Sequence, residues 1–423
     1  MPDEPVDLDD VDLAARSRHG IRHAARGRAR PPGGEARHLA GSAAGRILIG
    51  AVVAIAVATL IGLVALWPRG STVPQSAAAT SAATTSARVD RIVDFRCPGP
   101  AAQRCRWLIA DVDGTSTTLT LGPVTVAADV RPGDRIRVLK VVVPAGAEGL
   151  DKVEPYAFVG VDRHRSVVAL ALALAALALV ALRGRGLLAV IGVGLSLLLL
   201  TTFVVPALLA GRPAILVALV GSLAVMFVTL VLTNGVGAQT LAAALGVSAT
   251  LLLTSLLAVL ASNLASLDGK VSELSTTLSA QTPGLSLQGV VIAGMVIGAL
   301  GVLADTAVTQ ASAVMALRRA NPLLHARELY RSALTVGRDH LSATIHTLVL
   351  AYAGASLPLL LVLNAIHSTV TDSLNYQDTA EPIVATVIGC AGLIAAVPFT
   401  TLLAALLISR VPATSLPQVH HAH

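Results

Sequence analysis

Residues 289–317 read GVVIAGMVIGALGVLADTAVTQASAVMAL, an apolar segment in which Asp305 is the single charged residue. A helix needs about 20 residues to cross the hydrocarbon core of a bilayer, so this segment is long enough to span it. A carboxyl group in hydrocarbon is costly and is usually held against protein or water. The segment therefore predicts a membrane-spanning helix with an unusual acid inside it.

The small and polar residues of this segment recur at spacings of four, three, four, four and three. At about 100° per residue, such spacings put them on one face of a helix. Glycine lets another helix approach closely, so we expect the glycines to mediate helix packing and the acid to be buried within that contact. The face consists of Gly294, Gly298, Gly301, Asp305, Thr309 and Ser312.

The composition of the whole chain agrees with a membrane protein. Hydrophobic residues make up 54% and charged residues 13% of its 423 residues, and the mean hydropathy is +0.74. Soluble domains typically contain about 25% charged residues. Eight apolar segments are long enough to cross a bilayer, at about 47–67, 166–182, 187–209, 213–233, 240–262, 289–317, 341–363 and 383–409.

The positive charges indicate an orientation and argue against a nucleic-acid partner. Arginines are dense before the first segment and between the sixth and seventh, whereas the short loops on the opposite side contain only Arg212 and Lys270. Lys and Arg in short loops favour the cytoplasmic side. We therefore expect both termini in the cytoplasm, and we attribute the pI of about 9.7 mainly to topology. No aromatic residues accompany the basic arm, so no nucleic acid is expected.

The expected fold is mainly α: a polytopic protein of about eight transmembrane helices with a small extracytoplasmic antiparallel β domain. Residues 71–87 are rich in Ser, Thr and Ala, which is typical of a flexible tether. The expected organisation is a disordered cytoplasmic arm (1–46), a first transmembrane helix (47–67), the tether (68–87), the β domain (88–162), a seven-helix membrane domain (163–410) and a cytoplasmic tail (411–423).

The β domain is predicted from alternating strands and tight turns. Strand patterns begin at Trp107 and Thr117 and meet at Asp113-Gly114, a favoured hairpin turn, and a third follows from Arg135. We expect a small β-barrel. Cys97 and Cys105 lie in the same domain outside the membrane, where the environment is oxidising, so they are candidates for a disulfide.

Asp305 is the main candidate for function. It lies 13 residues before Arg318, which is about 20 Å along a helix and therefore deep in a hydrocarbon core of about 30 Å. An unpaired carboxylate is disfavoured there, which makes Asp305 a candidate proton carrier or cation ligand. The alternative is a neutral or hydrogen-bonded acid that joins helices, with Thr306, Thr309 and Gln310 beside it.

The seventh segment contains polar residues that could meet this acid. Asp339 and His340 precede it, and Thr347 and Tyr352 lie within it. His346 also lies within it, and an imidazole can carry a proton, bind a metal or make a structural hydrogen bond, so all three roles stay open for it. The transport or polar-core candidates are Asp305, Thr309, Gln310, Ser312, Asp339, His340, Thr347 and Tyr352.

Motifs of enzymes are missing from the sequence. There is no phosphate-binding Gly-x-x-x-x-Gly-Lys loop, His-Glu-x-x-His motif or Gly-x-Ser-x-Gly elbow, and no Cys/His cluster has zinc spacing. We expect no enzyme activity, no catalytic residues and no cofactor, and metal binding stays open.

Three blocks of the chain resemble the YibE/F-like membrane proteins. They are Gly301-Val-Leu-Ala-Asp305-Thr-Ala-Val-Thr-Gln310, then Glu328-Leu-Tyr-Arg followed by Val336-Gly-Arg-Asp-His340, and Thr347-Leu-Val-Leu-Ala-Tyr352 through Pro358. The resemblance covers roughly residues 160–410. It implies the membrane architecture and draws attention to Asp305, Gln310, Asp339, His340 and Tyr352, but it implies no substrate. His346 departs from the asparagine usual in the family, which weakens a metal or proton role for it.

Two functional hypotheses follow. The first is a transporter or permease-like protein that moves a small solute or ion, with Asp305 coupling proton or cation movement. The second is a scaffold or accessory factor whose domain at residues 88–162 binds an envelope protein. Either would contact the lipid bilayer as a multi-pass protein of a bacterial inner membrane, a source suggested by the abundance of Ala and the preference for Arg over Lys. The oligomeric state stays open.

Overall fold

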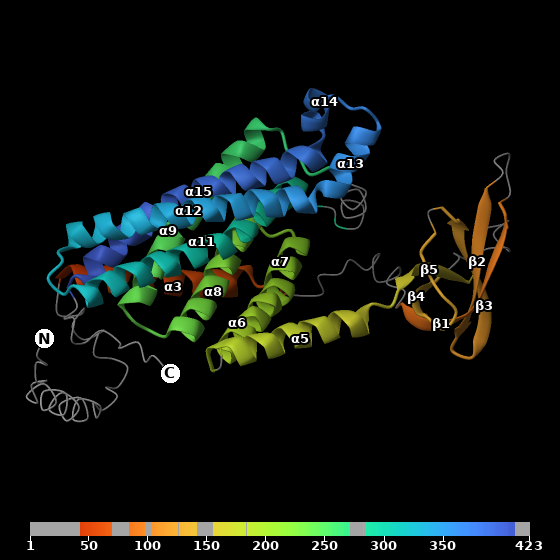
Figure 1. The fold of residues 1–423 in the computed structure, drawn as a ribbon, viewed down its shortest axis with the longest axis horizontal. Helices are drawn as coiled ribbons and strands as arrows, with labels where there is room; N and C mark the ends of the chain where they lie inside the picture. Colours follow the sequence, from red (N-terminus) through yellow and green to blue (C-terminus); the bar gives the residue numbers. More distant parts are fainter. Residues whose placement is uncertain are drawn as a thin grey trace, which may run out of the picture.

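The computed structural model describes residues 43–69, 84–97, 103–125, 127–141, 155–182, 184–270, 282 and 284–410. Most of the predicted arm and of the predicted tether, and the predicted C-terminal tail, lie outside these residues. The last four residues of the predicted arm, 43–46, are helical, so the first helix begins earlier than predicted. The described part is mostly helical, with one antiparallel sheet inserted between the first and second helices (Figure 1).

The N-terminal half of the helical part contains short and medium helices. Figure 1 shows them from red through yellow to green. They are α3 (Ala43–Leu66), α5 (His164–Leu182), α6 (Gly184–Leu199), the π-helical turn η1 (Leu200–Val204), α7 (Val205–Leu209), α8 (Ala214–Asn234) and α9 (Ala238–Leu264).

The C-terminal half contains the three longest helices. They run side by side along the bundle (Figure 1), and two short helices connect the second to the third. These elements are α11 (Leu287–Ala320), α12 (Ala326–Ala355), α13 (Leu357–Ala365), α14 (Val370–Asn375) and α15 (Gln377–Ile408).

Seven helices in the described part are long and apolar enough to cross a membrane by themselves. They match seven of the eight predicted segments. The remaining segment, 341–363, falls on α12 and α13, which pass the same test only together and are bent by 56° at their junction. Pro358 lies in the first turn of α13, where its missing N–H costs no helical hydrogen bond, so α13 begins as a new helix. The described part therefore has seven candidate spans, or eight if the bent pair is one span.

The β domain is a five-stranded antiparallel sheet with the order β3-β2-β1-β4-β5, curled into a half-barrel. The predicted hairpin turn is confirmed, because Asp113 and Gly114 both have positive φ angles, 52° and 84°, as this turn requires. The sequence did not predict the first and last strands. The strands are β1 (Thr85–Arg96), β2 (Arg104–Val112), β3 (Thr115–Pro123), β4 (Arg135–Lys140) and β5 (Tyr156–Val161).

The inner face of the sheet forms its own apolar core, built from alternate residues of the strands such as Leu108, Leu119 and Ile136, all fully buried. The predicted disulfide between Cys97 and Cys105 is confirmed, and it joins the end of β1 to the start of β2. The sheet therefore has a core and a covalent link independent of the helices.

The helical core has α11 near its centre. Two clusters of buried apolar side chains lie along it, and both include residues of α8, α9, α11 and α15. By contrast, α5 has no buried residue and lies at the periphery of the bundle. Any site within the bundle is therefore formed mainly by α9, α11, α12 and α15.

Candidate functional site

Helix α11 has two different faces. Its buried face carries Leu303, Thr306, Ala307 and Gln310, all fully enclosed. The face with Gly294, Gly298, Gly301 and Asp305 is exposed on the surface of the chain.

The expectation that Asp305 is buried between two spans of this chain is therefore wrong. Among the described residues no charged side chain is buried, and the side chain of Asp305 has no hydrogen bond or ion pair there. The physical reason lies on the opposite face, where Leu, Val, Met and Ala side chains provide the apolar surface that packs into the core. A stripe of glycines has little surface of this kind to offer.

Two of the three glycines of this face, Gly294 and Gly301, do not mediate helix packing within this chain either. A Cβ atom added at Gly294 or Gly301 would meet nothing within 4 Å. At Gly298 it would lie 3.1 Å from the hydroxyl of Tyr352 on α12, so at this glycine another helix does approach closely. The predicted face is real as a periodic pattern, but it is the open side of α11.

Contacts of α11 with its neighbours give the depth of Asp305 in the bundle. Ser312 accepts a hydrogen bond from Nε2 of Gln239, the second residue of α9, at 2.6 Å. Gly289 packs against Ala214, the first residue of α8. Asp305 is seven residues from Ser312, which is about 10 Å along the helix. It therefore lies well inside the length covered by α8 and α9.

The polar residues that the structure brings together lie on the buried face. Thr401 of α15 donates a hydrogen bond to Oε1 of Gln310 at 3.0 Å. The Gln310 amide rests against Gly337 of α12, where an added Cβ would lie 2.7 Å from Oε1. An amide and a glycine thus allow α11, α12 and α15 to meet closely at one level.

A second glycine extends this contact to α9. The hydroxyl of Thr400, next to Thr401 on α15, packs against the backbone of Gly246. Thr306 is one turn from Gln310 on the same face of α11 and is fully buried. We call this set the polar junction; its members are Gly246, Thr306, Gln310, Gly337, Thr400 and Thr401.

The polar junction contains buried groups without partners. Within the described residues, Nε2 of Gln310 and the hydroxyls of Thr306 and Thr400 are buried and make no hydrogen bond. Nε2 of His340, one turn beyond Gly337, is in the same condition. An unsatisfied buried polar group costs about 1–3 kcal/mol, so these groups add nothing to the stability of the bundle.

The other candidates from the sequence lie around this junction. Asp339 and Thr347 are exposed on α12, and Tyr352 is half-buried against α11. Thr309 is half-buried, and its hydroxyl donates to the carbonyl of Asp305. His346 is exposed, and its Nδ1 lies 2.7 Å from the carbonyl of Ser342, so this nitrogen carries the proton.

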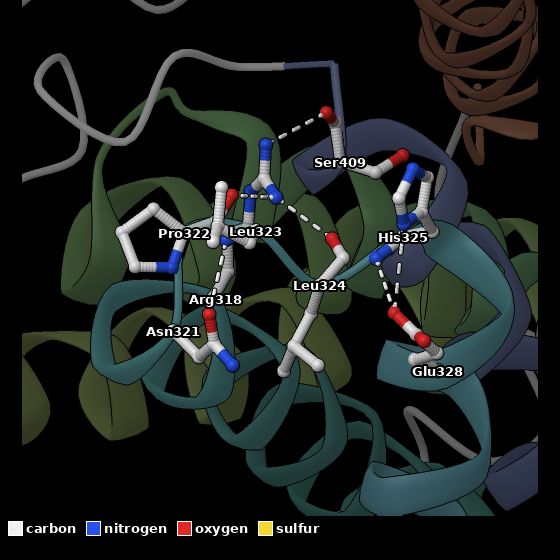
Figure 2. A network of polar contacts seen from close by, with 8 residues as sticks. All are labelled: Arg318, Asn321, Pro322, Leu323, Leu324, His325, Glu328 and Ser409. Atoms are coloured by element: carbon white, nitrogen blue, oxygen red, sulfur yellow. Dashed lines mark hydrogen bonds and ion pairs between the residues drawn. The ribbon is translucent and has the colours of Figure 1, made fainter.

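One end of the same three helices is tied together by Arg318 (Figure 2). Its guanidinium donates to the carbonyls of Pro322 and Leu324 in the turn between α11 and α12, and to that of Ser409 just after α15 at 3.2 Å. An arginine is favourable at a helix C-terminus, where carbonyls lack helical partners. Glu328 caps the start of α12 by accepting from the backbone N–H of His325 at 2.9 Å.

The sheet offers a second surface. Phe95 and Trp107 pack against each other on adjacent strands, with ring centroids 4.2 Å apart, and Trp107 is exposed. Nearby, Arg106 donates to Asp94 at 2.8 Å, and this contact holds the pKa of the Asp94 carboxyl below its ordinary value.

No metal centre is seen in the described part of the chain. No group of three or more His, Cys, Asp and Glu side chains there has the arrangement to hold an ion. His340, His346 and Asp305 therefore do not form such a cluster with one another.

Sequence reasoning missed most of the polar junction. Of its members only Gln310 was a candidate, because the partners Gly337, Thr400 and Thr401 lie on other helices. Two signals were available: a Thr-Thr pair in the most C-terminal apolar segment, and a glycine in the polar half of α12.

Apolar helices long enough to cross a bilayer, with their polar contacts gathered inside the bundle, define a multi-pass membrane protein. The profile of the YibE/F-like protein family matches residues 170–410, and the chain belongs to this family. The resemblance noted in the sequence is thereby confirmed. No curated protein and no solved structure matches the chain.

Proposed function

We propose that this protein is a transporter or permease-like protein in which α11, α12 and α15 form the moving core. The observation that carries the proposal is the polar junction, where the buried Gln310 amide has a partner for its oxygen and none for its nitrogen. A bundle that only needed stability would gain by filling this place with apolar side chains. Polar groups at membrane depth instead suit a pathway for a small solute or ion.

Asp305 is the proposed coupling residue. It lies on the opposite side of α11 from the junction, at a depth where a lone carboxylate is costly. Binding of a proton or a cation would neutralise the carboxylate and remove that cost. The position of α11 that is most stable with a neutral Asp305 would then differ from the one that is most stable with a charged Asp305. Movement of α11 would in turn alter the contact of Gln310 with Gly337 and Thr401. The proposed activity moves matter across the membrane and involves no bond chemistry.

Proton flux into liposomes tests the role of Asp305. The full chain is reconstituted around a pH-sensitive dye, and a potassium diffusion potential drives protons inward. We expect Asp305→Asn to slow acidification at least tenfold relative to the wild type. Asp113→Asn in the β hairpin is the matched control, because it removes the same charge at a turn position that asparagine tolerates.

Equal proton flux in the wild type and Asp305→Asn would contradict coupling through this acid. A sodium gradient in the same vesicles tests the cation alternative by the same comparison.

The surface of the sheet supports a second proposal, a scaffold or accessory factor. The exposed Trp107 with Phe95 is of the kind that anchors protein interfaces. Deleting residues 71–162 distinguishes the two proposals. If the protein is a transporter, the shortened chain should keep the ion flux of the full chain. If it is a scaffold, the full chain should show no ion flux, and the shortened chain should lose an envelope protein that co-purifies with the full chain.

We also propose that the chain resides in a bacterial inner membrane with both termini in the cytoplasm and the sheet outside. The Cys97–Cys105 disulfide suits an oxidising compartment. A single cysteine introduced at Arg131 on the sheet should react with an impermeant maleimide in intact cells, and one introduced at Arg327 should not. The reverse pattern would contradict this orientation.

A further inference from the structure

Three arginines lie on one face of the polar half of α12. Arg327, Arg331 and Arg338 are four and seven residues apart, which puts them within about 40° of one another around the helix. All three are exposed, and within the described residues none has a side-chain hydrogen bond or an ion pair. Arg318, at the same end of the bundle, is by contrast engaged by backbone carbonyls (Figure 2).

The contacts of α12 with its neighbours show where this face lies along the bundle. Gly337 packs against Gln310, and two residues beyond Gln310 along α11, Ser312 is bonded to the start of α9. Arg338 is thus close to the level at which α8 ends and α9 begins. Arg331 lies seven residues and Arg327 eleven residues further out, up to about 16 Å beyond that level.

The same face becomes apolar in the other direction. Ile345 is seven residues from Arg338, and Val349 is four residues further, so both continue the line of the arginines. Val349 is exposed on the surface of the bundle. Long side chains on a helix lean toward its N-terminus, so the guanidinium of Arg338 is directed toward the other two and away from the apolar part.

This order of groups is that of a phospholipid: charge at the membrane surface, then hydrocarbon along the span. Guanidinium groups bind phosphate oxygens through paired hydrogen bonds. The nearby acids do not neutralise the face. Glu328 and Asp339 each follow one of these arginines and so point about 100° away from it. Glu328 is also occupied by the backbone of His325.

We infer that Arg327, Arg331 and Arg338 bind the headgroups of anionic phospholipids, whose acyl chains then lie along Ile345 and Val349. The site is separate from the polar junction and does not depend on the proposed transport function. It holds α12, the helix that presents Gly337 to Gln310, at a fixed height relative to the membrane surface.

Lipid binding to the full chain in nanodiscs tests this inference. Discs of phosphatidylcholine alone are compared with discs of an equal mixture of phosphatidylcholine and phosphatidylglycerol. Retained lipids are identified, and their affinity is measured, by native mass spectrometry. Each basic residue near an anionic surface contributes about fivefold in affinity, so the set should contribute on the order of 100-fold.

We expect the triple variant Arg327→Gln/Arg331→Gln/Arg338→Gln to lose the preference for phosphatidylglycerol. A control triple in the sheet, Arg88→Gln/Arg91→Gln/Arg135→Gln, removes the same charge and should retain it. The three single α12 variants, each expected to weaken binding about fivefold, keep the test valid if the triple variant does not fold.

Two kinds of result would overturn the inference. The first is a failure of the comparison between variants: either the α12 triple variant keeps its preference for phosphatidylglycerol, or the sheet control loses it equally. The second is displacement of phosphatidylglycerol by inorganic phosphate at similar concentration, since that would identify the ligand as a free anion and leave the apolar end of the face without a role.

Discussion

At the scale of single residues, Gln310 shows how much a buried polar side chain requires from its neighbours. Its amide fits only because Gly337 has no side chain, and its oxygen accepts from Thr401. The single hydroxyl proton of Thr401 serves two acceptors, the carbonyl of Val397 at 2.6 Å and Gln310 at 3.0 Å. The Gln310 oxygen therefore shares its donor with a backbone carbonyl, and the Gln310 nitrogen has no acceptor.

Replacing Thr401 with valine should destabilise the bundle by about 1–3 kcal/mol, because the whole Gln310 amide is then buried without a partner. The double variant Gln310→Leu/Thr401→Val should lose less than the two single variants together, because it leaves no polar group stranded. Thermal unfolding in detergent, followed by circular dichroism, measures both effects. Additive losses would mean that the two side chains do not interact.

Gly246 and Gly301 allow a matched comparison of the same substitution at a packed and at an open position of the bundle. A Cβ at Gly246 would overlap the Thr400 hydroxyl and lie 3.1 Å from the Thr400 Cα, so α9 and α15 would have to separate. We expect Gly246→Ala to cost about 1–3 kcal/mol, as overpacking usually does. Gly301→Ala meets nothing within 4 Å and should be neutral or slightly stabilising in the same unfolding experiment. Similar losses for both would contradict the packing described for α9.

At the scale of elements, periodicity in the sequence identified the faces of α11 correctly and assigned packing to the wrong one. Spacing alone shows that Gly294 and Asp305 share a face, but it does not show which face meets the neighbouring helices. That choice depends on apolar side chains such as Leu303 and Val314, whose partners come from distant parts of the chain. The bend between α12 and α13 has a similar origin, since proline can kink a helix or begin a new one.

The sheet gives a prediction for the acid range. Arg106 lowers the folded-state pKa of Asp94, so this ion pair contributes stability above the unfolded pKa of an aspartate, about 3.9. The contribution is lost as the pH falls through the lower folded-state value. Asp94→Asn should therefore reduce the loss of sheet stability on acidification. Trp107 fluorescence in a Trp67→Phe background reports it, and identical acid titrations of both proteins would contradict the role of Asp94.

At the scale of the whole molecule, the sequence predicted what local patterns determine: the apolar helices, the strands that follow Trp107, Thr117 and Arg135, the hairpin turn and the disulfide. It did not predict the polar junction, because no local pattern links Gln310, Gly337 and Thr401 across three helices. Nor did it predict strands β1 and β5, the first and last along the chain, whose pairing is settled by the sheet and not by their own residues. The contacts between residues far apart in the sequence were thus the part of the structure that the sequence did not predict.

The distribution of buried residues predicts which parts of the chain are needed for folding. Helix α3 packs through Trp67, which stacks on Phe203 with ring centroids 5.7 Å apart, and through Gly62 against Val220. Between helices in lipid, removing such contacts forfeits little hydrophobic free energy, since acyl chains replace them. A chain of residues 163–410 should therefore remain folded and monodisperse in detergent, with a modestly lower unfolding temperature.

The comparison is a chain of residues 163–376, which retains α5 to α14 and lacks α15. Removal of α15 takes away Thr401 and Val397 and leaves Gln310 and Thr254 facing solvent or lipid, so we expect aggregation on size-exclusion chromatography. If both chains aggregate, α3 or the sheet is part of the folding unit. If both stay monodisperse, α15 does not complete the core, and the polar junction does not hold the bundle together at the level of Gln310.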